Sequence, residues 1–201
     1  MSDQPETDRI AIEDLTDELA ATYTAQGYTL AFTEDVMRRD VRDTRDLPEA
    51  TLPGGVSLAA WKPGTAPSFF AAYAAAFADR PGFPGWSQER WVEWTSDDPD
   101  FRPDLSWVAL APPGPVGFIT CCLDARGETP LGFIIQTGTR PDWRGRGLAG
   151  ALVARALWGF REDGRTAVLL DVNTNNPGAR RLYERLGFVA IRRRGVFTRG
   201  G

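Results

Sequence analysis

A short run with two glycines between an apolar segment and a helical stretch could bind phosphate. The run is Arg144-Gly145-Arg146-Gly147-Leu148-Ala149; apolar residues 131–135 precede it, and residues 148–161 have helical character. The first turn of a helix has free N–H groups and the positive end of the helix dipole, so it attracts anions. Glycine has no β-carbon, so a phosphate can approach the backbone closely at Gly145 and Gly147. The spacing is neither G-x-G-x-x-G nor that of a Mg-nucleotide loop.

A second block has the same order of strand, turn and helix. Residues 167–173 alternate as a half-buried strand does, and Asn176-Pro177 provides an N-cap and a proline at the first helical position. Gly187 lies where a left-handed C-terminal cap belongs. The helix carries an i, i+3, i+4, i+7 apolar stripe made of Ala179, Leu182, Tyr183 and Leu186.

These two blocks resemble the two signatures of the GNAT acyltransferase family. Arg144-x-x-Gly147-x-Ala149 is similar to the family's pyrophosphate loop, and the string from Asn176 to Gly187-Phe188 is similar to its second signature. The resemblance is strongest over residues 131–190. Within the family the chain resembles the ribosomal-protein alanine acetyltransferases and the C-terminal half of tandem, mycothiol synthase-like members.

The resemblance implies acetyl-coenzyme A, or another acyl-coenzyme A, as co-substrate. Backbone amides after Arg144 would hold its diphosphate, and the backbone of residues 137–139 would pair with the pantetheine arm. Asn176 would be both an N-cap and a cofactor contact. The implied cofactor-binding residues are Thr137, Gly138, Thr139, Arg144, Gly145, Arg146, Gly147, Leu148, Ala149, Gly150 and Asn176.

The resemblance also implies two proton-transfer roles. Tyr183 falls where family members place the general acid, and a phenol of pKa near ~10 can protonate a leaving thiolate. The alternative for Tyr183 is an aromatic residue of the core. Asp171 matches a position where the ribosomal-protein branch has a glutamate base, and its alternative is a structural carboxylate. Asp124 and Glu128 are further candidates for the base.

The acceptor pocket is expected near residues 83–98. Phe83, Trp86, Trp91 and Trp94 would wall it, unless they are core residues, as most aromatic residues at such spacing are. The acidic side chains there would hold a cation or form a solvated face; they are Glu89, Glu93, Asp97 and Asp98.

Deprotonating a lysine at pH 7 costs roughly 4.6 kcal/mol, whereas an α-amine costs only about 1–1.4 kcal/mol. A weak base therefore suits an α-amine better.

Composition excludes several other classes of function. The chain has 201 residues and no histidine, which removes Ser-His-Asp and Cys-His systems and His-based metal sites, so we expect no metal. Cys121 and Cys122 are adjacent and lack zinc-ligand spacing; we interpret them as small apolar residues, with a thiol role as the alternative. Residues 1–50 carry 13 acids and 5 bases, which argues against nucleic-acid binding. With no long apolar run and a polar N-terminus, a cytoplasmic protein without membrane contact is expected.

The order of elements matches that of the family, and the resemblance implies an α/β (α+β) protein with the GNAT fold, a central mixed, mostly antiparallel sheet flanked by helices. Helices are expected over 67–79, after Ser87 to about Thr95, over 148–161 and after Asn176. Strands are expected over 56–61, 106–110, 116–123, 131–137, 167–173 and from Phe188.

The N-terminal region resembles a later part of the same chain at a constant offset. Shifted by 160, Tyr23 meets Tyr183, Gly27 meets Gly187, and the matches continue to Arg199. We interpret residues 10–41 as a helix and hairpin left from a lost first copy. The expected organisation is an N-terminal extension with a linker over 1–52 and an acyltransferase domain over 53–201, in which a fragmentary copy could mediate homodimerisation.

The leading functional hypothesis is an N-acyltransferase that transfers an acetyl group to a primary amine of a small molecule or a peptide N-terminus by direct attack. The alternatives are a catalytically weak acyl-coenzyme A-binding module or subunit, and an acyl-thioester enzyme with a non-amine acceptor.

Overall fold

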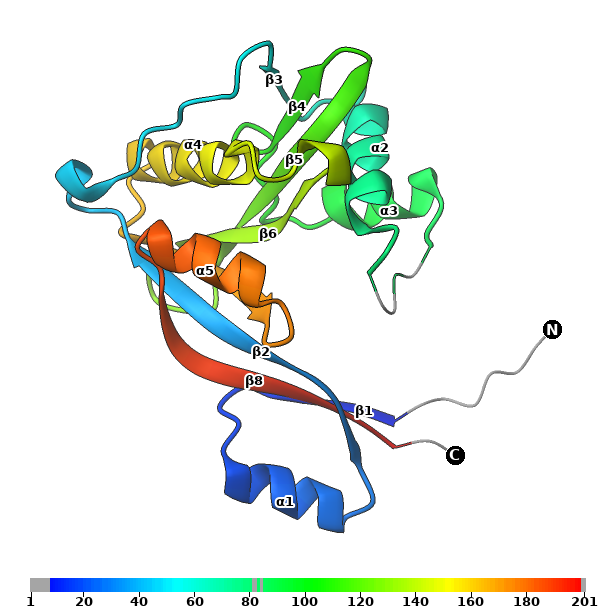
Figure 1. Cartoon of the computed structure of the whole chain (residues 1–201). Helices are drawn as coiled ribbons and strands as arrows, with labels where there is room; N and C mark the ends of the chain where they lie inside the picture. The colour runs from blue at the N-terminus through cyan, green and yellow to red at the C-terminus, as the bar shows by residue number, and fades with distance from the viewer. Residues whose placement is uncertain (1–7, 81–82, 84, 200–201) are drawn as a thin grey trace. The chain divides into compact units, whose positions relative to one another are not determined.

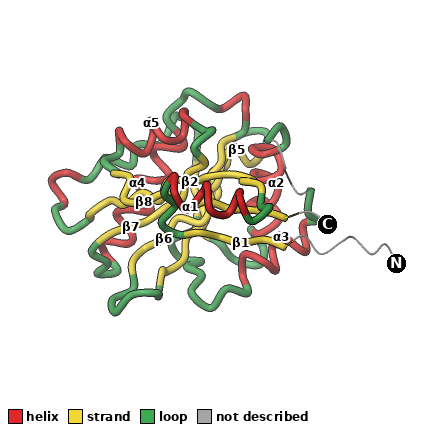
Figure 2. Tube along the Cα trace, turned by 90° about the horizontal axis from the view of Figure 1, so that it is seen from below, coloured by secondary structure: helices red, strands yellow, loops and turns green. Residues whose placement is uncertain are grey.

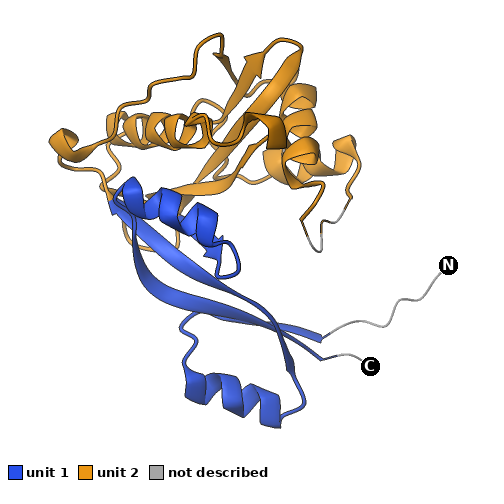
Figure 3. Cartoon of the chain, in the orientation of Figure 1, with its two compact units in different colours: residues 1–39, 170–201 blue, residues 40–169 orange. Residues whose placement is uncertain are grey.

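The computed structural model describes residues 8–80, 83 and 85–199, which form two compact units (Figure 3). Unit 1 takes in the described residues of 1–39 and 170–201, and unit 2 consists of residues 40–169. Strand β7, Ala167–Asn173, begins in unit 2 and ends in unit 1.

Unit 2 is built on the strand order β7-β6-β5-β4-β3, in which β3 to β6 pair antiparallel (Figure 1). Its strands are β3 (Ser57–Ala60), β4 (Trp107–Ala111), β5 (Gly114–Asp124) and β6 (Leu131–Thr139). Its α-helices are α2 (Ala66–Phe77), α3 (Gln88–Ser96) and α4 (Leu148–Glu162), and η1 (Thr44–Asp46) and η2 (Pro141–Trp143) are short 3-10 turns.

Helices cover both faces of this sheet. A β-carbon built at Gly117 would meet Leu148 of α4, whereas the ring of the next residue, Phe118, lies edge-on to Tyr73 of α2. Successive strand residues point to opposite faces, so α4 and α2 lie on opposite sides. The α4 sequence suits this place, because its buried residues recur with helical spacing: Leu148, Ala151, Leu152, Val153, Ala154, Ala156, Leu157 and Phe160.

A β-bulge interrupts the pairing of β5 and β6. Thr120 lies opposite Gln136, but Cys121 lies opposite Ile134, so Ile135 is an extra residue on β6. Such a residue reverses which face the following side chains take. Accordingly, a β-carbon at Gly132 would meet Phe160 of α4, and one at Gly138 would meet Ala76 of α2. Because of the bulge, even-numbered residues of β6 face α4 before Ile135 and α2 after it.

Unit 1 consists of two strand-helix-strand segments whose strands follow the order β1-β8-β2-β7. The first segment has β1 (Asp8–Ile12), α1 (Asp17–Ala25) and β2 (Thr29–Asp40, whose last residue lies in unit 2). The second has β7, α5 (Pro177–Arg185) and β8 (Val189–Arg199). Figure 2 shows the elements by type, with helices in red and strands in yellow.

The two segments are related by an internal two-fold symmetry. Helices α1 and α5 start and end at positions that differ by 160, and each is followed by a left-handed glycine, Gly27 (φ 85°) or Gly187 (φ 81°). The pairing of β2 with β8 is unchanged when each residue is replaced by its equivalent in the other segment, 160 positions away. Thr29 lies opposite Thr198, and their equivalents, Val189 and Arg38, also lie opposite each other. The central pair, Glu34 opposite Arg194, lies on the axis of this exchange.

Most expected elements are confirmed, but the hairpin predicted after the N-terminal helix is wrong. Residues 29–40 form one continuous strand and do not turn back on themselves. The pairing of this strand with β8 shifts by one residue at Ala31. The centre of this segment, Thr33-Glu34-Asp35, has no glycine or asparagine to support a tight turn, and it pairs with β8. Strand β1 was not expected.

The predicted mixed, mostly antiparallel sheet with flanking helices is confirmed. Among the described residues, none of the helices combines the length and hydrophobicity that crossing a bilayer would require.

Candidate active site

The N-terminus of α4 is open toward any ligand that approaches the glycine run. Gly145 and Gly147 both have left-handed φ angles, 78° and 83°, and a β-carbon built at either would meet nothing within 4 Å. No side chain caps the helix, and its first helical hydrogen bond runs from Ala151 N to Gly147 O at 3.0 Å. The amides of residues 148–150 therefore form the uncapped first turn, as the sequence predicts.

Arg144 holds this run in place. Its guanidinium donates to the carbonyls of Ala76, at 2.9 Å, and Thr139, at 3.3 Å, so it links the end of α2 and the end of β6 to the loop. Arg146 is exposed and lies over the ring of Trp143, 4.6 Å from its centroid. Arg144 therefore stabilises the loop through its hydrogen bonds, whereas the exposed guanidinium of Arg146 places a positive charge beside the start of α4.

The end of β6 carries the three residues predicted to pair with a pantetheine arm. Thr137 donates to the Phe118 carbonyl at 3.0 Å, and the Thr139 hydroxyl is buried with no hydrogen-bond partner among the described residues. Gly138 has a packing role, since a β-carbon there would come within 2.7 Å of Ala76 Cβ and 2.8 Å of Phe118 Cε1. Pairing of this backbone with a pantetheine arm stays a prediction.

In unit 1, Asn176 caps α5 as expected. Its side chain accepts from Ala179 N at 3.1 Å, and Pro177 is the first helical residue. The turn before it is fixed by the bond from Asn176 N to Asn173 O at 2.8 Å, which connects the cap to the end of β7. The capping role is confirmed, and a cofactor contact by Asn176 stays a prediction.

Tyr183 lies on the buried side of α5. It is only 7% exposed, and its ring packs edge-on against Phe188 at 5.9 Å. Burial raises the pKa of Tyr183 to about 12, because the phenolate would lose its hydration. The phenol therefore keeps its proton at neutral pH, although it is a weaker acid than an exposed tyrosine.

Asp171 lies on β7 in a charged cluster that also involves β2 and β8. Arg194 Nη2 is 2.9 Å from Asp171 Oδ2 and 2.5 Å from Glu34 Oε2. Burial opposes the charge of Arg194, but the hydrogen bond to Glu34 and the charges of Asp171, Glu34 and Glu13 outweigh it, so the pKa of this guanidinium is raised. The carboxylate of Asp171 is thus oriented by a cation.

Beside this cluster, Asp35 on β2 is a second buried carboxylate. Its side chain is 4% exposed and pairs with Arg193 Nε at 3.0 Å and with Arg180 of α5. A buried carboxylate is tolerated when cations bind it in this way. Asp35 therefore ties α5 to the strands of unit 1.

The aromatic residues of the α2–α3 region are mainly core. Trp91 is fully buried, stacks on Tyr73 at 4.8 Å and donates through Nε1 to Gln136 at 3.3 Å. Trp86 and Trp94 form an edge-on pair near the surface, with Trp94 47% exposed. Trp91 is therefore a core residue, which was the alternative to a role in the wall of the acceptor pocket. Phe83 packs partly buried against the same core, and the four acidic side chains, Glu89, Glu93, Asp97 and Asp98, are exposed.

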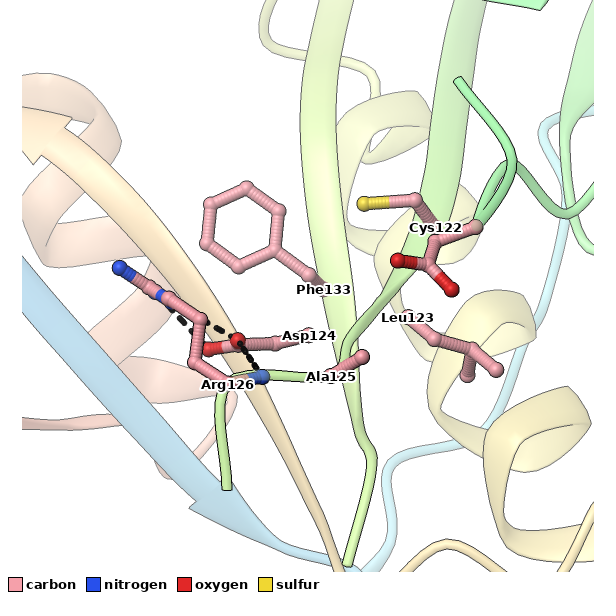
Figure 4. A pocket seen from close by; sticks show the side chains of 7 residues that line it. Cys122, Leu123, Asp124, Ala125, Arg126 and Phe133 are labelled. Carbon is pink, nitrogen blue, oxygen red and sulfur yellow. Dashed lines mark hydrogen bonds and ion pairs between the residues drawn. The ribbon is translucent and has the colours of Figure 1, made fainter. Parts of the chain in front are cut away.

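A hollow of about 440 Å³ lies at the far end of the β5–β6 hairpin (Figure 4). Cys122 and Asp124 line it, and Asp124 pairs with Arg126 at 2.8 Å. Cys122 lies opposite Phe133 in the β5–β6 register. Phe133 is six residues, or roughly 20 Å, from Thr139, the end of β6 that leads to the glycine run. Asp124 and Glu128 therefore lie away from that run.

Neither cysteine is suited to nucleophilic chemistry. Burial, followed by the neighbouring carboxylates, raises the pKa of Cys122 to about 12. Burial also raises the pKa of Cys121 well above the ordinary value. Both thiols are protonated at neutral pH, and a thiol is a far poorer nucleophile than a thiolate.

Sequence reasoning missed the carboxylates of β2 and their arginine partners. Their contacts join residues about 145–160 positions apart, as in Asp35–Arg180 and Glu34–Arg194. One signal was available: at the repeat offset of 160, acidic Glu34 aligns with basic Arg194.

Comparison with known proteins gives a consistent result. The model of the "Acetyltransferase (GNAT) family" matches residues 67–188, more than half of the chain. The mycothiol acetyltransferase of Thermobispora bispora is 34% identical over 173 residues, which cover 84% of this chain and 58% of that relative. The chain thus spans little more than half of this relative's length.

Solved structures resemble the chain as well. A GCN5-related N-acetyltransferase from Sphaerobacter thermophilus matches with a TM-score of 0.77 and 25% identity, over 96% of this chain and 59% of that one. A tandem GNAT protein from the clavulanic acid biosynthesis pathway matches with a TM-score of 0.69 and 14% identity, over 96% and 63%. At 14% identity the latter likeness concerns the fold.

Proposed function

The chain belongs to the acetyltransferase (GNAT) family, and from that premise we propose that it transfers an acetyl group from acetyl-coenzyme A to a primary amine of a small molecule. The observation that carries this proposal is the uncapped start of α4 behind Gly145 and Gly147. The homologues' names support an acetyltransferase, and the geometry of the glycine run supports the donor.

The residues at the start of α4 fit a diphosphate. The amides of residues 148–150 are donors, and the space that β-carbons would take at Gly145 and Gly147 is open. Anions are stabilised at such a helix start by the N–H groups and by the dipole. The exposed cation of Arg146 adds attraction at the same place.

Two side chains of unit 1 are proposed for proton transfer. Tyr183 would protonate the departing thiolate, since its phenol keeps its proton at neutral pH. Asp171 would take the proton from the attacking amine, directly or through a water. Arg194 would keep this carboxylate in one orientation. Direct attack is proposed because both cysteines are protonated and buried.

The small-molecule amine is the favoured acceptor because the Thermobispora relative is a mycothiol acetyltransferase that aligns with 84% of this chain. A peptide N-terminus is the other acceptor of the same class. An amine of low pKa fits better than lysine, because deprotonating lysine at pH 7 costs roughly 3 kcal/mol more.

A catalytically weak acyl-coenzyme A-binding module is the second candidate. The observation that favours it is the depth at which Tyr183 is buried, since a phenol of pKa about 12 donates its proton less readily.

One experiment separates the two candidates. The purified 201-residue chain is mixed with acetyl-coenzyme A and a panel of amino sugars, arylamines and peptides, and thiol release is followed. Release that depends on one amine supports the acetyltransferase. Binding of coenzyme A by calorimetry without release from any amine supports the module, and absence of binding refutes both.

A further inference from the structure

In unit 1 a single nitrogen atom joins two carboxylates from different strands. Arg194 Nη2 on β8 lies 2.5 Å from Glu34 Oε2 on β2 and 2.9 Å from Asp171 Oδ2 on β7. The side chains of Glu34 and Asp171 are 15% and 17% exposed, so these bonds are largely shielded from water. Charge-assisted hydrogen bonds in such surroundings are strong and geometrically specific.

We propose that Glu34 is a positioning residue for acetyl transfer, acting on Asp171 through Arg194. The inference rests on the proposed function and deepens it, because it assigns a role in the reaction to a residue of the N-terminal repeat. Glu34 itself contacts neither the donor nor the acceptor in this scheme.

The backbone fixes where the three side chains start. Glu34 and Arg194 are directly opposite in the β2–β8 register, at the axis of the internal two-fold. The flanking pair, Asp35 opposite Arg193, is also bonded, at 3.0 Å. Two consecutive cross-strand ion pairs leave Arg194 little freedom, so its position relative to β7 is set by β2.

Charge balance gives Glu34 a second effect. Ion pairs within the described part of the chain join Glu34 on β2, Asp171 on β7, Arg192 and Arg194 on β8, and Glu13 after β1. Glu13 Oε2 lies 3.3 Å from Arg192 Nη2, and Glu13 Oε1 lies 3.9 Å from Arg194 Nη1. Glu34 is thus one of three carboxylates that share these two guanidinium groups.

The negative charge of Glu34 helps the neighbouring carboxylate of Asp171 to accept a proton. If Glu34 is replaced by glutamine, Arg194 retains Asp171 as its close carboxylate partner, and Asp171 loses one nearby negative charge. A carboxylate that keeps its cation but loses a neighbouring anion holds a proton less tightly. Loss of Glu34 should therefore slow proton removal without affecting the donor's binding site on α4.

The test compares Glu34→Gln with Glu34→Asp and with Glu18→Gln in the full chain. Glu18 is a matched control, since it is an exposed glutamate on α1 of the same repeat, where its backbone carbonyl accepts a hydrogen bond from the Thr22 hydroxyl at 2.9 Å. Glu34→Gln should lower kcat about tenfold, less than the 10²–10⁴ of a direct general base, with an unchanged KM for acetyl-coenzyme A. Glu34→Asp, which keeps the charge, should recover most of the rate, and Glu18→Gln should match the wild type.

A double-mutant cycle assigns the effect to Asp171. In an Asp171→Asn background, Glu34→Gln should cause no further loss of kcat, because the group on which it acts is gone. An additive loss there would overturn the inference, and so would a Glu34→Gln variant with wild-type kcat. A fall in Tm with unchanged kcat per folded molecule would likewise overturn it, since that is the result of a purely structural role.

The two proposals fail in different ways. If the wild-type chain acetylates no amine of the panel, the proposed function fails and this inference fails with it. If the wild type is active and the Glu34 variants behave like Glu18→Gln, the inference alone fails.

Discussion

Replacing Gly147 by alanine should separate backbone strain from ligand contact at the start of α4. The residue has φ 83°, and an added β-carbon would meet no atom within 4 Å, so the change creates no clash in the free protein. Only the left-handed backbone is penalised, by about 1–2 kcal/mol.

Coenzyme A should suffer more than folding does. The new methyl group would occupy the open space at Gly147, where the diphosphate has to approach the amides of residues 148–150. Losing one charge-assisted hydrogen bond costs about 1.5–3 kcal/mol, which corresponds to roughly 10–150-fold in Kd.

Gly164→Ala is the matched control. Gly164 also lies in unit 2, has φ 78° and has nothing within 4 Å of an added β-carbon, but it follows the other end of α4. Both variants should lose similar unfolding free energy by urea titration. Only Gly147→Ala should weaken coenzyme A in calorimetry. Equal affinities for coenzyme A in the two variants would refute a diphosphate site at the start of α4.

Three further predictions concern side chains. Tyr183→Phe should lower kcat at least tenfold, with the Kd of acetyl-coenzyme A unchanged by calorimetry, and a wild-type kcat would exclude the acid role. The same substitution has a pH signature. Burial raises the pKa of Tyr183 to about 12, above the ordinary value of ~10, so the unfolded chain loses this proton first and the free energy of unfolding falls as pH rises from 10 to 12. The wild type should therefore lose about 2 kcal/mol of unfolding free energy relative to Tyr183→Phe over that window, measured by urea titration, and parallel curves would contradict the burial argument. Iodoacetamide at pH 8 should label Cys121 and Cys122 far more slowly in the native chain than in urea, as read by mass spectrometry, and equal rates would show accessible thiolates.

Local signals in the sequence predicted the second strand-helix block closely. Asn176, Pro177 and Gly187 each act through the backbone within a few residues, and all three have the expected conformation. The glycine run before α4 was predictable for the same reason, because glycines and a helix start need no distant partner. The strand β7 was found from its own alternation.

Contacts between distant segments were not predictable in this way. The ion pair of Glu34 and Arg194 depends on the register of β2 against β8, and nothing in either strand alone specifies that register. The expected hairpin failed for a related reason, since the extended residues after Gly27 pair with β8 rather than with each other. The domain remnant at residues 10–41 remains a proposal, for which the shared register of the two segments is support.

The self-mapping register of β2 and β8 has a consequence for how charges can be arranged at its centre. Two identical polypeptides related by a dyad must present the same side chain twice at the point where the dyad crosses, so glutamate would meet glutamate there. Within one polypeptide the two equivalent positions can carry different residues, and here they are an anion and a cation, Glu34 and Arg194. A two-fold arrangement inside one chain thus permits an attractive pair at a place where a symmetric dimer would be limited to like with like.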